Sequence, residues 1–440
     1  MNSLTMAASR RGFLGMAAGG ALAAALAGAP RAARAKVATR ARIAILGAGA
    51  GGTAMANRLA ERLEGAQITV IDPRPRHLYQ PGFTLIAAGL KPAAYSVSRN
   101  EDWLPKGITL VAETAAEIDP VGKSVTTDKG TRVDYDFLVV ATGLKLDWGA
   151  IEGFSTDLIG KDGIGAVYAG PEAAEATWRE MDRFTDKGGK ALFFRPATEM
   201  KCAGAPLKYT FLTEDYATRK GTRGKTEITY VSPTKALFGV PIVSEKVRML
   251  YDARGIQTVY EHKMTAIDPG RKIVTFEDAD GIAQEMEYDF TNVIPPQVAP
   301  DVIRNSPLPW ADKWQDQGWV EADPGTLRHG RFPEVFALGD VAGVPKGKTA
   351  ASVKWQVPVI EDHIVADIEG KQGTAVYDGY TSCPLITRVG RAMLVEFDYK
   401  NNLVPSFPGV IAPLEELWIS WLMKEVALKA TYNAMLRGKA

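Results

Sequence analysis

The chain holds only two cysteines, and both lie in segments whose other residues suit redox chemistry. Cys202 stands in EMKCAGAPLKY (residues 199–209), and Cys383 stands in YTSCPLI. Two cysteines are too few for a disulfide framework, so they form either one structural bridge or one functional pair. Lysines flank Cys202, and a positive environment keeps a thiolate ionised. The pattern favours a redox pair, with Lys208 as its cation and Glu199 as a candidate proton acceptor.

A glycine-rich turn near residue 50 must position a nucleotide. RIAILGAGAGGTAMANRLAERL predicts a strand, a tight turn with Gly47, Gly49 and Gly52, and a helix. Gly47 allows the turn, Gly49 lets the backbone approach a pyrophosphate, and Gly52 lets helix and strand pack closely. The next strand, QITVIDPR, ends in Asp72, which can accept from ribose hydroxyls. The signal is strong because strand, helix and acid are all in place.

Two further segments favour FAD over NAD. YDFLVVATG ends in Thr142 and Gly143, and PEVFALGDVAG contains Gly339 and Asp340. Both resemble motifs of the flavin-dependent disulfide reductases, and the resemblance implies that Asp340 binds the ribityl chain. These motifs predict an α/β fold with two Rossmann-like, three-layer domains in tandem. Residues 36–150 and 295–370 form the expected FAD-binding domain.

The inserted second Rossmann-like domain, residues 151–294, lacks the NAD fingerprint. GKALFFRP predicts its first strand, but the following turn keeps only Gly204, and the later strand TEITYVSP ends in no acid. A cradle for a pyridine nucleotide needs those glycines and that acid. We therefore expect the electron donor to be a substrate other than NADH.

The cysteine segments resemble the sulfide:quinone oxidoreductase family, most closely its branch with the mitochondrial enzymes. The resemblance covers nearly the whole chain beyond residue 35, and the matching segments are KCAGAPLKYTFLTED, YTSCPLITRVGRAMLVEFDY, HLYQPGFTL and KGKTAASVKWQ. It implies that hydrosulfide attacks a Cys202–Cys383 disulfide, that Cys383 holds the added sulfur, and that FAD passes two electrons to membrane quinone. Sulfane sulfur or polysulfide is released, and Lys348 stabilises charge near the flavin. Some relatives tether FAD through a third cysteine, which is absent here, so we expect noncovalent FAD.

The two ends of the chain suggest where the protein works. Residues 1–35 combine Arg10 and Arg11 with an apolar run and an A-x-A site, which predicts a twin-arginine signal peptide and a periplasmic location. In the C-terminal region, residues 371–440, apolar residues including Trp418 and Trp421 recur at helical spacing, with Tyr432 and lysines nearby. This fits a helix on the outer face of the inner membrane, although a core or dimer helix gives the same stripe.

Three other functions stay open. One is the flavoprotein subunit of a flavocytochrome c sulfide dehydrogenase, another is an NADH:quinone reductase, and the third is a non-catalytic flavin- or sulfur-binding module. The four histidines show no metal-ligand spacing, so we expect no metal. The formal net charge of +1 implies no basic surface for nucleic acid, and a homo-oligomer stays open.

Overall fold

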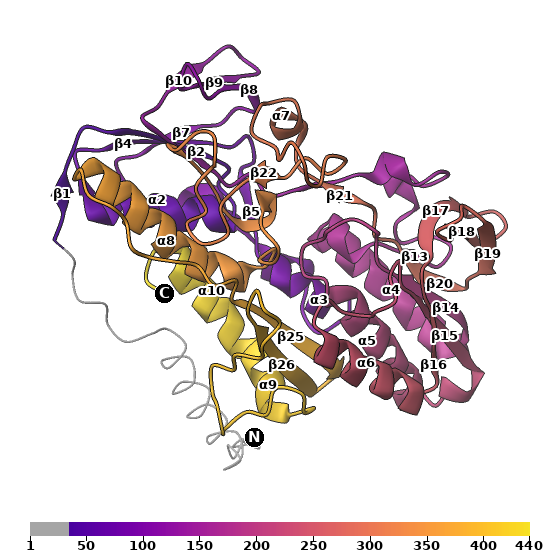
Figure 1. Ribbon diagram of the computed structural model, residues 1–440. Helices are drawn as coiled ribbons and strands as arrows, with labels where there is room; N and C mark the ends of the chain where they lie inside the picture. Colours follow the sequence, from indigo (N-terminus) through magenta and orange to yellow (C-terminus); the bar gives the residue numbers. More distant parts are fainter. Residues whose placement is uncertain (1–34) are drawn as a thin grey trace, which may run out of the picture.

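The computed structural model describes residues 35–440. One half of the molecule, made of two separate stretches of the chain, is built on a five-stranded parallel sheet in the order β23-β11-β2-β4-β7. The strands are β2 (Arg42–Leu46), β4 (Gln67–Ile71), β7 (Thr109–Val111), β11 (Phe137–Val140) and β23 (Val335–Ala337). Helices α2 (Ala50–Arg62) and α8 (Ala350–Ile368) pack together on one face, and the antiparallel strands β8 (Ala115–Asp119), β9 (Ser124–Thr127) and β10 (Arg132–Asp134) lie on the other side (Figure 1). The central strands are almost wholly apolar because both faces of the sheet are covered.

The other half of the molecule, formed by the middle of the chain, has a parallel sheet of the same kind in the order β13-β20-β14-β15-β16. Its strands are β13 (Ile164–Gly165), β14 (Gly189–Phe194), β15 (Thr226–Val231), β16 (Ile256–Val259) and β20 (Phe290–Asn292). Helices α4 (Pro171–Lys187), α5 (Ala205–Arg219) and α6 (Pro241–Ala253) cover one face, and the antiparallel strands β17 (Lys263–Asp268), β18 (Ile273–Glu277) and β19 (Ala283–Glu287) lie on the other (Figure 1). The predicted fold class, two Rossmann-like units in tandem, is confirmed.

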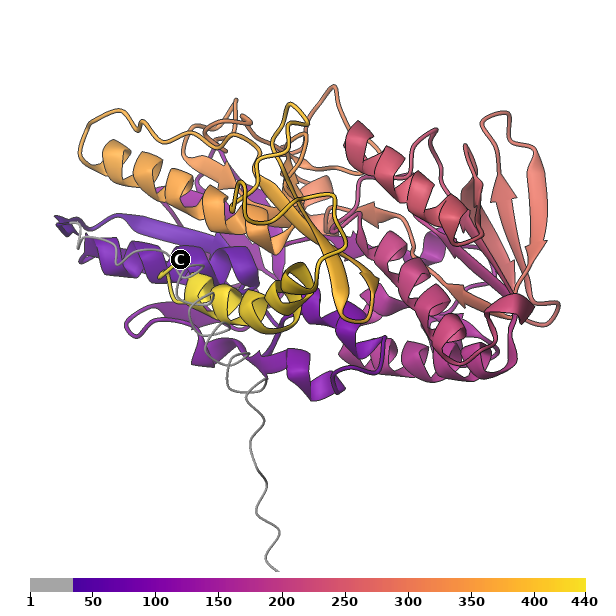
Figure 2. The same ribbon diagram turned by 90° about the horizontal axis from the view of Figure 1, so that it is seen from below.

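The C-terminal segment lies between the two halves, as Figure 2 shows for the yellow part of the ribbon. It begins with an antiparallel hairpin of β25 (Thr381–Arg388) and β26 (Arg391–Phe397), which packs against α5. A helix follows in three parts: α9 (Trp418–Leu422), the π-helical turn η9 (Met423–Ala427) and α10 (Leu428–Leu436). Since α10 packs against α2, this segment joins the cysteine-bearing part of the chain to the glycine turn.

The remaining elements are short. They are β1 (Val37–Ala38), β3 (Leu63–Glu64), β5 (Arg76–Leu78), α3 (Phe83–Ile86), β6 (Val97–Arg99), β12 (Lys145–Leu146), β21 (Gln297–Val298), α7 (Asp301–Arg304), β22 (Val320–Glu321) and β24 (Ala342–Gly343).

Part of the apolar stripe of the C-terminal helix, which was predicted to face a membrane surface, packs inside the protein instead. Trp421 and Tyr432 are buried, whereas Trp418 and Val426 are exposed by about half. Tyr432 therefore does not serve as a residue of the helix surface, which corrects the prediction for that side chain. Within residues 35–440, no helix is long and apolar enough to cross a membrane.

Candidate active site

The two cysteines meet where the hairpin packs on the start of α5. Cys202 lies in the turn between β14 and α5, and Cys383 lies on β25, buried. The two thiols lie close enough that each shifts the pKa of the other. The approach depends on Gly204, because a Cβ added there would lie 2.4 Å from the Sγ of Cys383. Packing of α5 on β25 thus brings together two residues far apart in sequence.

The backbone of Cys202 is held in a left-handed conformation, with φ of 48°. A residue other than glycine adopts this region rarely, and it persists where the surroundings hold it. Here the Cys202 amide donates to the carbonyl of Lys348 at 3.0 Å. The hydroxyl of Tyr168 donates to the carbonyl of Cys202 at 3.0 Å and to that of Lys201 at 3.1 Å. The turn is therefore tied to both halves of the molecule.

Lys208 is the cation of this pair. It is buried in the first turn of α5, and its Nζ lies 3.5 Å from the Sγ of Cys202. The hydrogen bond from Cys383 and the charge of Lys208 outweigh burial and hold the pKa of Cys202 well below its ordinary value. Burial opposes the charge on Lys208, but the neighbouring thiols raise the pKa of Lys208 to about 12. The arrangement favours a Cys202 thiolate paired with an ammonium.

Lys424, which the sequence reasoning did not select, is a second buried lysine beside the thiols. It lies in the π-helical turn η9, and its Nζ donates to the carbonyl of Pro81. Burial, with repulsion from Lys208, lowers the pKa of Lys424 to about 7. Single π-helical turns inside α-helices are frequent at functional sites. The sequence does contain a sign of this buried lysine, because Lys424 lies three residues after Trp421 and therefore on the apolar stripe of the helix.

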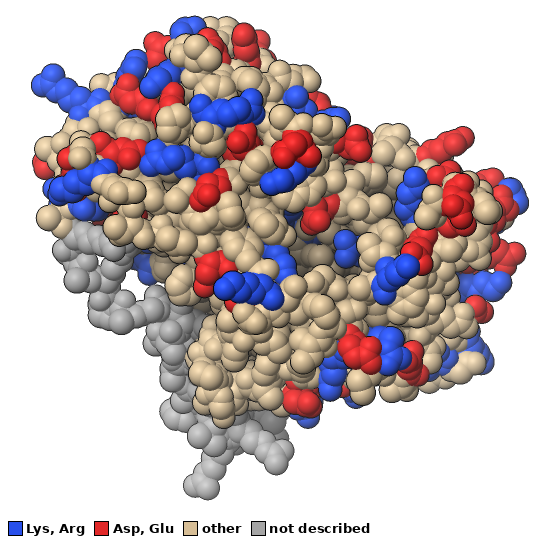
Figure 3. All heavy atoms as spheres, in the orientation of Figure 1, with Lys and Arg blue, Asp and Glu red and all other residues tan. Residues whose placement is uncertain are grey.

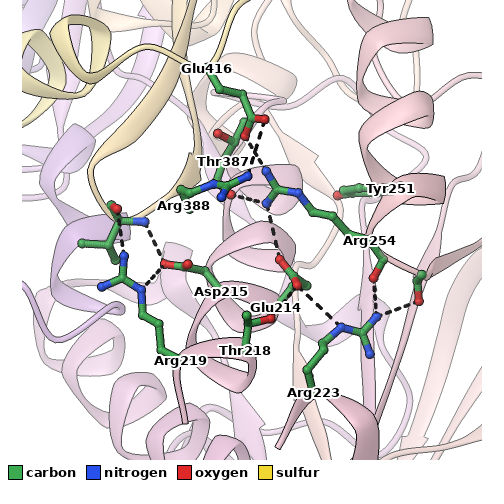
Figure 4. A network of polar contacts seen from close by, with 12 residues as sticks. Glu214, Asp215, Thr218, Arg219, Arg223, Tyr251, Arg254, Thr387, Arg388 and Glu416 are labelled. Carbon is green, nitrogen blue, oxygen red and sulfur yellow. Dashed lines mark hydrogen bonds and ion pairs between the residues drawn. The ribbon is translucent and has the colours of Figure 1, made fainter. Parts of the chain in front are cut away.

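A network of buried charges ties α5 and α6 to the hairpin that carries Cys383 (Figure 4). Arg254, at the end of α6, contacts Glu214 of α5 at 3.4 Å and also pairs with Glu416. It donates to the carbonyl of Thr387 on β25. A second link runs from Asp215, which accepts from the amide at the hairpin turn at 2.9 Å. The network therefore fixes the strand of Cys383 against the helix that begins after Cys202.

A cavity of about 310 Å³ runs from the glycine turn to the cysteines. The predicted residues that line it are Gly49, Thr142, Gly143, Asp340, Gly339 and Lys348, together with Cys202, Lys208 and Cys383. Figure 3 shows the surface hollowed between the two halves, with acidic and basic side chains interspersed around it. Residues from three separate predicted motifs thus meet the thiols in one space.

The remaining predicted residues do not line the cavity. Gly47 and Gly52 lie behind the turn, and a Cβ at Gly52 would come within 1.8 Å of the Gly47 carbonyl oxygen. Asp72 is buried and accepts from the Ala48 amide at 2.6 Å and from the guanidinium of Arg74. Its burial raises its pKa, but the bonds and charge of Arg74 outweigh this, so the pKa of Asp72 is lowered.

Glu199 also lies outside the cavity. Its side chain is exposed, and its amide donates to the Gln317 side chain at 2.9 Å. The charge of Glu199 partly offsets the lowering of the Lys348 pKa, and its role as a proton acceptor for Cys202 stays a prediction.

Lys348 and Asp340 form the polar end of the cavity near the second flavin-type motif. The Nζ of Lys348 donates to the carbonyls of Asp340 at 2.6 Å and Ala342 at 3.1 Å. Burial lowers the pKa of Lys348 to about 8, although the Asp340 carboxylate opposes this. Burial also raises the pKa of Asp340.

The lining residues fit a flavin dinucleotide. A Cβ at Gly49 would meet nothing within 4 Å, so the turn faces open space at the N-terminus of α2. Such a terminus binds a pyrophosphate through its free amides and its dipole. Asp340 and Lys348 then offer an acceptor and a cation farther along the cavity.

Two Rossmann-like sheets, a glycine turn and a cysteine pair define a nucleotide-dependent oxidoreductase with a dithiol centre. In agreement, the model of the pyridine nucleotide-disulphide oxidoreductase family matches residues 41–163. Curated relatives named as mitochondrial sulfide:quinone oxidoreductases, from Mus musculus and Dictyostelium discoideum, are each 34% identical over 90% of this chain and 86% of their own. The chain belongs to the sulfide:quinone oxidoreductase family, which implies a flavin cofactor.

The fold also matches a solved structure, the sulfide:quinone oxidoreductase of the hyperthermophilic bacterium Aquifex aeolicus. The TM-score is 0.70 at 22% identity, and the match covers 87% of this chain and 89% of the other.

The relatives overturn the predicted location. Three curated relatives, including one from Schizosaccharomyces pombe, are named as mitochondrial enzymes and point to a mitochondrial location. The prediction of a periplasmic protein was therefore wrong. The predicted signal peptide, residues 1–35, lies outside the described residues except for its last position.

Proposed function

We propose that the protein oxidises hydrosulfide at the Cys202–Cys383 pair and passes two electrons to a membrane quinone. The observation that carries the proposal is the contact of the two thiols beside the cavity, with the Lys208 Nζ 3.5 Å from the Sγ of Cys202. A structural bridge needs no buried ammonium, whereas a leaving thiolate is stabilised by one.

In the proposed reaction, hydrosulfide attacks Cys383 in the oxidised Cys202–Cys383 disulfide. The S–S bond breaks, Cys383 becomes a persulfide, and Cys202 leaves as a thiolate. Lys208 stabilises that thiolate, and Lys424 adds positive charge from the other side. Bound FAD supplies the two-electron chemistry that links the thiolate to the quinone. A nucleophile such as a second hydrosulfide then attacks the outer sulfur and carries it away as polysulfide, which leaves Cys383 as a thiolate. Loss of two electrons from the two thiolates restores the Cys202–Cys383 disulfide.

The FAD is proposed to be noncovalent, because the chain has no cysteine beyond the pair. Gly49 and the start of α2 would hold its pyrophosphate, and Thr142, Gly143, Gly339 and Asp340 would line the rest of its path. Lys348 would stabilise negative charge on the ring. In this proposal, residues 36–150 and 295–370 form the FAD-binding domain, residues 151–294 the second domain, and residues 371–440 the C-terminal region.

Quinone is proposed to enter from a membrane surface beside the C-terminal region. The aromatic and apolar side chains of Trp355 and Pro384 line the cavity and would contact the quinone. Trp355 is 49% exposed and Trp418 is 50% exposed. Indole side chains of this kind favour the interface between water and lipid. The protein would therefore bind the membrane surface peripherally.

An anaerobic titration with sulfide, followed in the visible spectrum, tests the proposal. We expect sulfide to bleach the FAD band and a short-chain quinone to restore it, whereas Cys383→Ser stays unbleached at the same sulfide concentration. Bleaching by NADH and not by sulfide would refute the proposal. Acid precipitation should release all FAD into the supernatant, and flavin retained in the pellet would contradict noncovalent binding.

A further inference from the structure

The β25–β26 hairpin presents different chemistry on its two faces. Cys383 pairs in register with Val395, and the preceding residue, Ser382, pairs with Glu396. Because neighbouring residues of a strand point to opposite faces, Glu396 lies on the face away from Cys383. The packing agrees: Cys383 and Val395 belong to one apolar cluster, and Leu394 belongs to another. One hairpin therefore brings a thiol and a carboxylate to the cavity from opposite faces.

Glu396 is a buried carboxylate held by hydrogen bonds. Its side chain is 3% exposed and accepts from the Ser406 hydroxyl at 2.5 Å, from the Ser406 amide at 2.8 Å and from the Tyr380 hydroxyl. Glu396, Tyr380 and Ser406 all line the cavity, and Ser406 is exposed to solvent. The three side chains form a hydrogen-bonded path from water to the interior.

The path ends at a part of the cavity lined by Trp355, Pro384 and Lys354, and the Nζ of Lys354 lies 5.8 Å from the centroid of the Trp355 ring. The ring of Tyr380 lies beside that of Trp355, with centroids 5.4 Å apart, and Pro384 lines the same space. The cationic side chains Lys208 and Lys424 lie instead beside the thiols. In the described part of the chain, Asp340 and Glu396 are the two carboxylates that line the cavity, and the charges that act on Asp340 are those of Lys201, Lys348 and Cys202.

We infer that Glu396 is the proton donor to the quinone, supplied from water through Ser406 and aligned by Tyr380. The inference rests on the proposed function. Reduction of a quinone takes two electrons and two protons. Oxidation of hydrosulfide supplies both electrons, by way of FAD, and one proton, so the second proton comes from water. The Glu396 carboxyl gives its proton to a quinone oxygen, and the resulting carboxylate takes a proton back along the Ser406 hydroxyl.

The Glu396→Gln variant tests this role, because glutamine keeps the shape and an accepting oxygen but cannot donate the acidic proton. We expect sulfide to bleach its FAD at the wild-type rate. Reoxidation by quinone should slow about 100-fold, the range of a lost general acid. Reoxidation by ferricyanide, which takes electrons without protons, should stay at the wild-type rate. A non-reducible quinone analogue should quench the tryptophan fluorescence of both proteins with equal affinity.

A role of Glu396 in structure alone gives different results. It predicts equal slowing with quinone and ferricyanide, or a weaker affinity for the analogue, and either outcome overturns the inference. Reoxidation by quinone at the wild-type rate also overturns it. Glu415→Gln is the matched control, because that carboxylate is 62% exposed and should leave every rate unchanged.

Should Glu396→Gln fail to fold, Ser406→Ala gives a second test, since Ser406 is exposed. We expect reoxidation by quinone to slow severalfold and reoxidation by ferricyanide to stay unchanged. An unchanged rate with quinone would refute the path through Ser406. Failure of the proposed function is seen separately, as a wild-type protein that sulfide does not bleach.

Discussion

The Nζ of Lys208 lies 3.5 Å from the Sγ of Cys202, at the point where related folds carry the glycines of a nucleotide turn. Helix α5 begins between the two residues, so its N-terminus adds its dipole to the charge of the lysine. The thiol and its cation therefore come from one short segment. Cys383 is added to them by tertiary packing.

Replacement of Lys208 by methionine should raise the pKa of Cys202. The ammonium favours the thiolate, so its removal favours the thiol, and a shift of one unit leaves about tenfold less thiolate at any pH below the pKa of Cys202. Alkylation of the reduced protein by iodoacetamide, measured against pH, checks this. Lys235→Met is the control, because that side chain is 83% exposed and should leave the profile unchanged. Identical profiles for both variants would contradict the role of Lys208.

A methyl group at residue 204 should separate the cysteines. In Gly204→Ala the added Cβ would lie 2.4 Å from the Sγ of Cys383, closer than any real contact, so the hairpin must move away. We expect disulfide formation between Cys202 and Cys383 to slow at least about tenfold, since a disulfide tolerates little change in Cβ separation. Counting of free thiols during oxidation measures this. Gly224→Ala, where a Cβ meets nothing within 4 Å, should oxidise like the wild type.

The stability of the protein should depend on pH through Lys424. Its folded pKa is lowered to about 7, so between about pH 7 and its unfolded value of 10.5 the unfolded chain holds a proton that the folded chain does not. The burial penalty is therefore complete below pH 7 and disappears as the pH rises.

The Lys424→Met variant should accordingly gain stability over the wild type at pH 6, and its advantage should shrink towards pH 10. Thermal unfolding of both proteins across this range measures the difference in Tm. Lys439→Met, at an exposed position, should show a difference in Tm that does not change with pH. A constant difference for Lys424→Met would show that Lys424 stays charged in the folded protein.

Removal of Arg254 should destabilise the protein strongly. The variant Arg254→Met leaves the carboxylates of Glu214 and Glu416 without their shared cation, and all three side chains are largely buried (Figure 4). Arg223 beside Glu214 and Arg388 beside Glu416 lie farther away, at 3.6 and 3.7 Å, and compensate part of the remaining charge. The loss should therefore reach about 3 kcal/mol, the lower end of the cost of breaking a buried pair. The free energy of unfolding in urea measures the loss.

Arg248→Met is the matched control for Arg254, because Arg248 pairs with Glu245 and Asp252 on the exposed side of the same helix. Its loss should leave the free energy of unfolding almost unchanged, because water screens an exposed ion pair. A similar effect of the two substitutions would mean that the buried network does not hold the hairpin.

Much of the fold could be read from local patterns. The strand, turn and helix around Gly47, Gly49 and Gly52 follow from apolar runs and glycine spacing, and they were predicted where β2 and α2 occur. The absence of an NAD-type glycine fingerprint after β14 could also be read locally, because the turn there keeps only Gly204. The role of Glu199 stays a prediction, because sequence proximity to Cys202 does not determine on which side of a turn a carboxylate lies.

The C-terminal helix shows the opposite case. Its apolar stripe predicted a helix, and a helix is present, but the stripe alone could not assign it to the surface or the interior. Packing on α2 buries Trp421 and Tyr432, and the π-helical turn directs Lys424 inward. The position of Lys424 on the stripe was visible, but its role could not be predicted, because the thiols that it meets come from distant segments of the chain.

The sequence by itself determined the two Rossmann-like units, the glycine turn and the presence of a single cysteine pair, because these depend on residue type and short spacing. The tertiary structure alone decided which groups meet. It placed Cys383 against Gly204, brought Lys424 to the thiols and turned Glu396 to the opposite face of the hairpin. Such contacts arise from packing between distant segments, and the register of a hairpin decides the face on which each side chain lies.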